Sequence, residues 1–161
     1  MAPEGIVSGT VFLIFSTATP GTPLRSVSEA SLEAGKGLVG DRYYAGVGTF
    51  SVKLKGSPDS EITLIESEEI ERFNHAENAS TAPGEFRRNI VTSGVRLNDL
   101  VGRRFTVGAA ELEGIRLCEP CSHLTKLVRP SVLRGMVHRA GLRARIVTGA
   151  IVRPGDRIEA S

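Results

Sequence analysis

The sequence is poor in cysteine and in aromatic residues, and it has no long hydrophobic run. Two cysteines in 161 residues are too few for a disulfide scaffold, which favours a reducing compartment, and we expect a cytoplasmic protein. The longest apolar run, residues 11–15, is too short to cross a bilayer, and the N-terminus lacks a signal-peptide pattern, so we expect no membrane contact. Tryptophan is absent and no helix-turn-helix, RNP or zinc-finger pattern occurs, so we do not expect nucleic acid as a ligand.

Charge is divided unevenly along the chain, although the net charge is only +2. Residues 1–86 hold 6 basic and 12 acidic side chains, whereas residues 87–157 hold 14 basic and 5 acidic ones. Lys126 is the only lysine among those 14, and the planar fork of arginine suits phosphate and carboxylate. Two interpretations stay open: the halves neutralise each other across one surface, or the arginine-rich half binds an anionic ligand.

The hydrophobic pattern predicts many short strands and few helices. Helices are expected over residues 68–76, with Ser67 as the cap, and over 121–128 and 130–138. Glycine and proline separate the strands at a spacing typical of barrels, and no long helices alternate with them, so we predict a mostly β fold in one domain. The expected strands are residues 5–15, 27–32, 49–55, 61–66, the part of 97–107 after Gly102, 110–117, 141–152 and 156–159.

Three glycines, Gly35, Gly37 and Gly40, match by letter the glycine pattern of a dinucleotide-binding loop. In such proteins the loop opens a helix that binds the phosphates. Here an Asp-Arg-Tyr-Tyr run without a helical pattern follows, so we do not predict a nucleotide fold.

The two cysteines lie in one short motif, RLCEPCSHL at residues 116–124. A structural zinc site needs four ligands, but one pair, Cys118 and Cys121, is present, and His123 is too close to complete it. A thioredoxin-like redox pair needs more strands and helices after the motif than the chain provides. Plain core packing would explain Cys118, which ends an alternating strand.

Cys121 has a more reactive setting. Pro120 precedes it and a helical pattern follows, so its thiolate would be stabilised by the unpaired N–H groups of a helix N-terminus. Arg116 or Arg129 would lower the pKa of this thiol further. Such a thiolate can act as a nucleophile, carry a persulfide, or give one bond to a soft metal that a cofactor already holds.

The order of motifs along the chain resembles that of the MOSC domain family, the C-terminal domain of molybdenum cofactor sulfurases, in its stand-alone bacterial form. The resemblance covers residues 5–159, which we take as a single domain. It implies a closed β-barrel of complex topology with a few short helices, a fold also described as pyruvate-kinase-barrel-like. The motifs are GLVGDRYY (37–44), EITLIESEEIE (61–71), EFRRNIVTSGVRLNDLVGRRFTVG (85–108), ELEGIRLCEPCSHL (111–124), HRAGLRARI (138–146) and GAIVRPGDRI (149–158).

The resemblance also assigns site residues. The cysteine that binds molybdenum in cofactor-containing members falls on Cys121, and Cys118 stands at a variable position. Arg87 and Asn89 match residues that help to hold the molybdopterin, which carries a phosphate, and Arg88 stands where relatives often have proline. Ser60 matches a polar position of the pocket only loosely. His138 begins a motif that in stand-alone members usually reads His-Arg-Gly-Gly-Leu. Here Ala140 stands in place of the first glycine, and we expect His138 to be structural.

Two functions from different classes follow from this resemblance. One is an oxidoreductase that reduces N-hydroxylated or N-oxygenated small molecules, with Cys121 on molybdenum, with Arg87, Arg88, Asn89 and Ser60 around the cofactor, and with electrons from redox partner proteins. The other is a sulfur carrier, in which Cys121 receives a persulfide from a pyridoxal-phosphate cysteine desulfurase. Larger members have an additional N-terminal barrel that closes over the cofactor, so the molybdenum cofactor need not be retained on purification.

Overall fold

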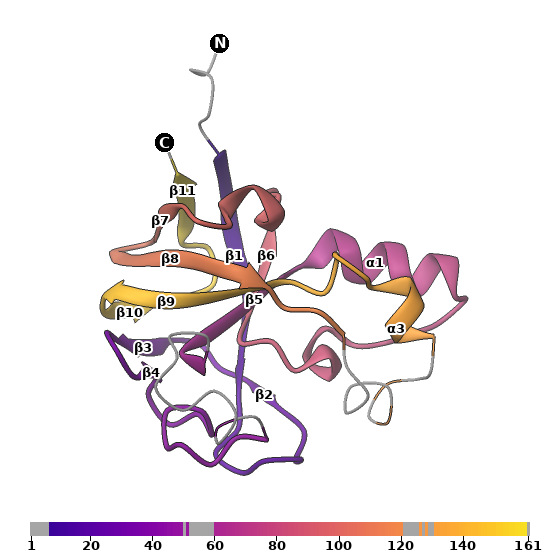
Figure 1. The fold of residues 1–161 in the computed structure, drawn as a ribbon, viewed down its shortest axis with the longest axis horizontal. Coiled ribbons are helices and arrows are strands. Elements are labelled where there is room, and N and C mark those ends of the chain that lie inside the picture. The colour runs from indigo at the N-terminus through magenta and orange to yellow at the C-terminus, as the bar shows by residue number, and fades with distance from the viewer. Residues whose placement is uncertain are drawn as a thin grey trace.

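The alternating segments form strands that close into a barrel. The structure is a computed structural model that describes residues 7–49, 51, 60–120, 126, 128 and 131–160. Within these ranges no helix has the length and apolar character needed to cross a bilayer. Each strand of the barrel pairs with the next around a closed ring (Figure 1). In order, the ring runs through β1 (Val7–Ser16), β11 (Arg157–Ala160), β7 (Arg104–Val107), β8 (Ala110–Leu117), β9 (Leu142–Thr148), β5 (Ile62–Glu66) and β6 (Ile90–Ser93), and returns to β1.

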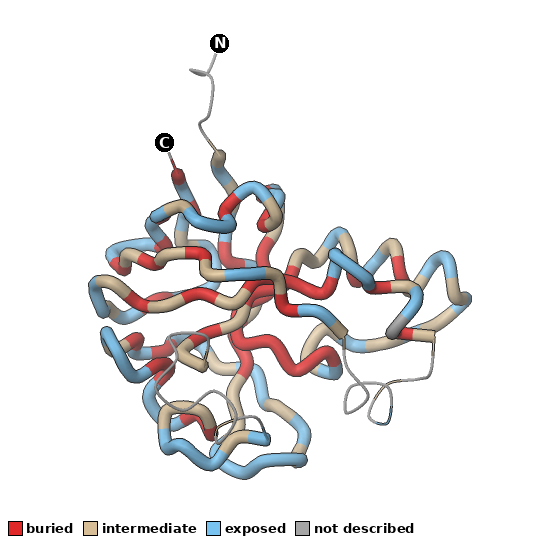
Figure 2. Tube along the Cα trace, viewed as in Figure 1, coloured by how far each residue is buried: buried red, intermediate tan, exposed pale blue. Residues whose placement is uncertain are grey.

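Barrel closure depends on contacts between distant parts of the chain. β1 and β11 are antiparallel, with Val7 opposite Ala160 and Thr10 opposite Arg157. The neighbours in the ring are antiparallel except β5 and β6, which run parallel. Successive side chains of a strand point to opposite faces, so the apolar residues of each strand fill the interior. Figure 2 shows this buried interior, which includes Ile14, Leu64, Leu112, Leu142 and Ile158.

A smaller sheet lies outside the ring. It consists of β3 (Ala30–Glu33), with β10 (Ala150–Val152) on one side and β4 (Gly37–Leu38) on the other. The short strand β2 (Arg25–Ser26) pairs with the end of β1. β10 follows β9 after one residue, so the predicted strand pair at 141–152 is present but divided between the two sheets.

A second apolar cluster packs beneath the helices. Helix α1 (Ser67–Ala76) buries Ile70 and Phe73, and the short helix α3 (Val132–Gly135) buries Val132. The Phe73 ring meets Phe86 edge to face, with 5.7 Å between the ring centroids. Phe86 ends the 3₁₀ helix η2 (Pro83–Phe86), and a second 3₁₀ helix, η3 (Leu97–Leu100), follows β6.

The structure confirms the predicted mostly β barrel and corrects some local expectations. Ser67 is not the helix cap: Glu66, the last residue of β5, is the N-cap, because the strand runs into the helix without a loop. The expected strand at 49–55 is wrong at residues 49 and 51, which lie in turns, and residues 50 and 52–55 fall outside the described part. The strand expected at 27–32 begins at Ala30.

Strand β9 is preceded by a close backbone approach to β5. Gly141, just before β9, has a φ of +112°, and a Cβ on it would lie 2.0 Å from the carbonyl oxygen of Leu64. Only glycine fits there. The Gly141 carbonyl accepts the N–H of Cys118 at 2.8 Å, so this contact also fixes the end of β8.

Candidate functional site

Arg87, which the sequence predicts to bind the cofactor, is buried at the end of η2. It is the C-cap of that 3₁₀ helix and has a left-handed backbone, with φ +64° and ψ +29°. Its side chain is 9% exposed, and its Nη1 donates to the Thr22 carbonyl at 2.6 Å. Its Nη2 is buried and has no hydrogen-bond partner among the described residues. A buried donor without a partner is costly, so this group is suited to bind a ligand acceptor.

Asp41 and Arg42, from the glycine-rich motif, form a buried ion pair near Arg87. Asp41 is 2% exposed and Arg42 is 5% exposed. Arg42 Nη1 lies 3.1 Å from Asp41 Oδ1. The carboxylate also accepts the N–H groups of Thr17, at 3.2 Å, and Tyr43, at 3.1 Å. Both oxygens of Asp41 are therefore engaged.

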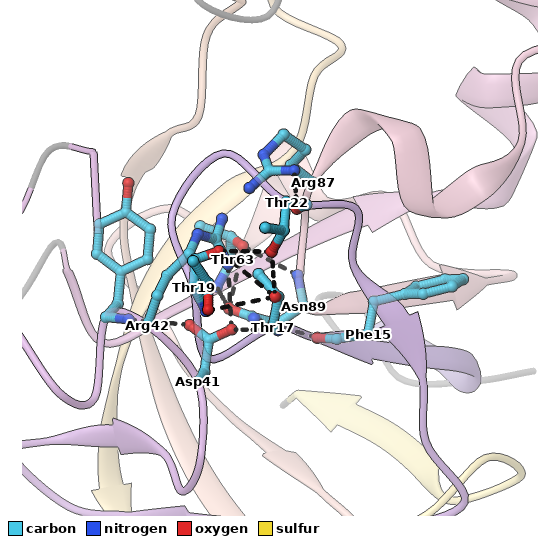
Figure 3. A network of polar contacts seen from close by, with 10 residues as sticks. Phe15, Thr17, Thr19, Thr22, Asp41, Arg42, Thr63, Arg87 and Asn89 are labelled. Carbon is cyan, nitrogen blue, oxygen red and sulfur yellow. Dashed lines mark hydrogen bonds and ion pairs between the residues drawn. The ribbon is translucent and has the colours of Figure 1, made fainter. Parts of the chain in front are cut away.

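Threonine hydroxyls surround these charges on the loop after β1. Thr17 Oγ1 and Thr22 Oγ1 are 2.7 Å apart, and Thr22 Oγ1 donates to the Thr19 carbonyl at 2.7 Å. The Thr17 carbonyl accepts the N–H of Arg42 at 2.8 Å. Figure 3 shows that Arg42, Arg87 and the threonines gather at one place, although they come from three distant segments.

The two guanidinium groups influence each other electrostatically. Burial lowers the pKa of Arg87 from its usual value, and the positive charge of Arg42 lowers it further, while Tyr43 and Asp41 raise it by smaller amounts. Arg87 stays protonated at neutral pH because the reference pKa of an arginine side chain lies far above 7. The described part of this cluster thus holds two guanidiniums and one carboxylate, which favours the entry of an oxyanion.

Asn89 joins three strands of the barrel. Its Oδ1 accepts the N–H of Thr63 at 3.2 Å and the Thr63 hydroxyl at 3.3 Å, and its Nδ2 donates to the Phe15 carbonyl at 3.2 Å. Its backbone N–H donates to Thr63 Oγ1 at 3.0 Å. In this arrangement Asn89 holds β1, β5 and the start of β6 together, beside the arginine cluster (Figure 3). A direct contact with the pterin stays a prediction.

Arg88 points to different partners from those of Arg87. Its guanidinium donates to three carbonyl groups: those of Ala140 at 2.9 Å, Phe86 at 3.1 Å and Cys118 at 3.2 Å. It is 8% exposed. Arg88 therefore connects three backbone segments, and its contact with a cofactor stays a prediction.

Two cavities are lined in part by residues of the threonine loop. One, of about 320 Å³, has Arg87 in its wall together with mainly apolar residues, among them Phe15, Leu24 and Pro83. The other, of about 670 Å³, is lined by the serine and threonine residues at 16, 17, 19 and 22, by Arg25 and by three apolar residues. Both are large enough for a small organic ligand.

The cysteine motif is described only up to Pro120. Cys118 is 1% exposed and its thiol is free, as expected for a structural position. Cys121, the predicted metal ligand, lies outside the described residues, as do His123 and Arg129. Glu119 accepts the backbone N–H of His138 at 2.7 Å, and its other oxygen lies 2.6 Å from His138 Nδ1.

The remaining predicted residue, Ser60, is half-buried next to the start of β5. In the described ranges, no group of three or more His, Cys, Asp and Glu side chains is arranged to hold a metal ion. A single thiolate on a cofactor-held metal, the arrangement expected for Cys121, does not require such a group.

The sequence analysis assigned no site role to Asp41 and Arg42. It considered the glycine pattern before them only as a possible dinucleotide-binding loop. The available signal was an adjacent acid and base directly after a glycine-rich turn. Gly37 has a φ of +128°, and a Cβ there would lie 2.7 Å from the Glu61 carbonyl oxygen. This close approach brings the motif against the start of β5 and so toward the arginine cluster.

The chain matches the family model described as MOSC domain over residues 51–159. Among solved structures, it is similar to the YUAD protein from Bacillus subtilis, with a TM-score of 0.81, 15% identity and 96% coverage of both chains. It is also similar to YiiM from Geobacillus stearothermophilus, with a TM-score of 0.73, 16% identity, and coverage of 95% of this chain and 75% of the other. For YiiM from Escherichia coli the TM-score is 0.66, with 19% identity and coverage of 94% and 69%. No curated protein matches the chain. At these identities the structural likeness shows the fold, and the match of the family model over most of the chain shows that the protein belongs to the MOSC domain family.

Proposed function

We propose that this protein binds the molybdenum cofactor and reduces N-hydroxylated or N-oxygenated small molecules, with electrons from redox partner proteins. The MOSC domain family is commonly associated with this cofactor. The observation that carries the proposal is the Arg87 guanidinium, which is buried, half-satisfied and close enough to Arg42 for the charge of Arg42 to lower its pKa.

The arginine cluster fits the phosphate of the cofactor. Asp41 already accepts from Arg42 and from two backbone N–H groups, so among the described residues it leaves the charge of Arg87 without an ion pair. A phosphate oxygen on Arg87 Nη2 would satisfy that donor and neutralise the excess charge. The Thr22 carbonyl orients the guanidinium by accepting a hydrogen bond from Nη1.

Asn89 and Cys121 would also help to position the cofactor. Asn89 fixes the start of β6 against β1 and β5, and so holds Arg87 in position. Cys121 would give one thiolate ligand to molybdenum, as the family resemblance implies. When bound, the cofactor supplies the oxygen-transfer and electron-transfer chemistry of molybdenum.

The test is the molybdenum and pterin content of protein purified without oxygen from a host that makes the cofactor. We expect near-stoichiometric molybdenum in the wild type, none in Cys121→Ala, and a large loss in Arg87→Gln. Cys118→Ala is the matched control, because Cys118 is a buried cysteine of the same motif. This variant should keep its molybdenum. Loaded wild-type protein should then reduce N-hydroxylated substrates.

Wild-type protein without molybdenum and without pterin would contradict the proposal. That result would leave the sulfur-carrier function. The diagnostic for it is a mass increase of one sulfur atom on Cys121 after incubation with a cysteine desulfurase.

A further inference from the structure

The cavity of about 320 Å³ next to Arg87 has a mostly apolar wall. Besides two glycines, its apolar lining residues are Phe15, Pro23, Leu24, Ala82 and Pro83. Covering such a wall with an apolar group is favourable, whereas a strongly hydrated phosphate gains nothing from it. The guanidinium suits the cofactor phosphate, but the apolar wall suits a ligand of a different kind.

Two segments that are distant in the sequence build this cavity and are held together. One is the threonine loop after β1, and the other is η2, whose C-cap is Arg87. Arg87 joins them, because its Nη1 donates to the Thr22 carbonyl at 2.6 Å. Gly84 lets η2 lie against Phe15, since a Cβ on Gly84 would be 2.9 Å from Cε1 of that ring. The cavity is therefore preformed.

Two charged side chains contribute to the wall, and they differ in their partners. Glu85 is exposed, and its Oε2 accepts the N–H of Ala82. Arg87 is 9% exposed, and its Nη2 has no hydrogen-bond partner among the described residues. Burial lowers the pKa of Arg87, and Glu85 is not among the charged groups that also shift it. A charged donor at this wall is thus available to a ligand.

The size and the chemistry of the cavity together define this ligand. A volume of about 320 Å³ lies at the lower end of ligand pockets and suits one aromatic ring or a short branched chain. A carboxylate accepts strongly from a guanidinium, and its single charge costs less to bury than the charge of a phosphate monoester. Because the Thr22 carbonyl already engages Nη1, the carboxylate would accept from Nη2.

We propose that this cavity binds a small apolar monocarboxylic acid, whose carboxylate accepts from Arg87 Nη2 and whose ring or chain packs against Phe15 and Leu24. The binding itself stands on the cavity and on the donor without a partner. Its consequence rests on the proposed function: the acid and the cofactor phosphate would use the same Nη2, so the acid competes with cofactor loading.

The test is a titration of the apo-protein, followed by NMR through the backbone N–H signals of Gly21, Gly84 and Arg87. The probes are benzoate, acetate, which lacks the ring, and benzyl alcohol, which lacks the charge. We expect benzoate to shift the three signals with one Kd. Acetate should bind at least about tenfold more weakly because it covers less apolar wall, and benzyl alcohol should do so because it lacks a charge-assisted hydrogen bond. Equal Kd values for benzoate and either analogue would overturn the proposal.

A matched pair of variants separates binding from stability. Leu13 and Leu24 are both half-buried and pack against the second apolar cluster, and of the two it is Leu24 that lines the cavity. Leu24→Asn should raise the benzoate Kd about fivefold or more, whereas Leu13→Asn should leave it unchanged, although both variants lower the Tm. The proposal fails if Leu24→Asn binds benzoate as tightly as the wild type.

The role of the guanidinium has its own variant. Arg87→Gln should raise the benzoate Kd roughly tenfold or more and leave the Kd of benzyl alcohol unchanged, because a charged donor is lost while the apolar wall remains. Inorganic phosphate should raise the apparent Kd of benzoate, since both anions accept from Nη2. Phosphate that shifts the Arg87 signal without changing the benzoate Kd would refute the competition.

The two proposals fail in different ways. Benzoate binding by a protein that never takes up molybdenum would leave the carboxylate site in place and refute the cofactor function. Molybdenum loading of a protein whose cavity signals do not respond to benzoate would refute the carboxylate site alone.

Discussion

Arg87 and Arg88 are neighbours in the sequence, but their side chains enter different surroundings. Arg87 adopts a left-handed backbone, which non-glycine residues rarely do and which tends to persist at functional sites. This conformation directs its guanidinium to the threonine loop and Arg42. The Arg88 guanidinium instead donates to the carbonyls of Phe86, Cys118 and Ala140. A pattern of two adjacent basic residues could not reveal this division, because it depends on the turn between η2 and β6.

Replacing Arg88 tests this division. Arg88→Met should lower the free energy of unfolding by about 2–4 kcal/mol, because three buried carbonyl groups lose a charged donor. The measurement is urea unfolding at neutral pH. Arg96→Met, at an exposed arginine, should change stability by less than about 0.5 kcal/mol. If Arg88→Met kept its full stability but lost molybdenum, Arg88 would be a cofactor ligand after all.

At the scale of elements, the start of helix α1 organises the turn between β6 and η3. Glu66 Oε2 accepts the N–H of Leu97 at 3.2 Å, and Glu68 Oε2 accepts the N–H of Gly94 at 2.7 Å. Acidic residues suit this position because the N-terminus of a helix carries a partial positive charge. The sequence predicted the helix with Ser67 as its cap, but it did not reveal that Glu66, at the end of strand β5, is the N-cap.

The pKa of Glu66 makes this junction sensitive to pH. Burial has the largest effect and raises that pKa above its usual value. The hydrogen bond from the Leu97 N–H lowers it, the negative charges of Glu69 and Glu68 raise it, and the positive charge of Arg96 lowers it by the smallest amount. When a carboxyl group has a higher pKa in the folded than in the unfolded protein, the free energy of unfolding falls as the pH rises from the unfolded-state pKa through the folded-state pKa. Glu66→Gln removes this loss, and its amide oxygen can still accept from Leu97.

We therefore expect Glu66→Gln to gain stability relative to wild type at about pH 7 and to gain less at about pH 3.5. The check is the free energy of unfolding from urea titrations at both pH values. Glu71→Gln, at an exposed position of the same helix, controls for the loss of one negative charge. A stability difference for Glu66→Gln that stays constant with pH would contradict the raised pKa.

At the scale of the whole molecule, the barrel is one closed unit with a shared core. The first and last strands of the ring, β1 and β11, pair with each other, and Ile158 on β11 is 1% exposed between Gly9 and Val107. A change at this seam should therefore affect the whole barrel and not only the chain end.

Ile158→Ala should lower the free energy of unfolding by about 2–4 kcal/mol while the transition stays single. Circular dichroism and thiol accessibility of the buried Cys118 would follow the same urea transition if the barrel unfolds as a unit. Ile151→Ala, at a position that is 47% exposed on β10, should cost less than about 0.5 kcal/mol. Separate transitions for the two probes would show that β11 frays independently.

The sequence by itself determined the class of fold, most strands and helix α1, because alternation and helical periodicity are local properties of the chain. It also determined the motif order that indicates the MOSC domain family, and thereby the choice of Arg87, Asn89 and Cys121. Only the tertiary structure decided that β1 closes on β11, that Asp41 and Arg42 lie near Arg87, and that Arg87 shares a cavity with Phe15 and Leu24. Those contacts depend on which distant segments pair and on which pack together, and no local pattern specifies either.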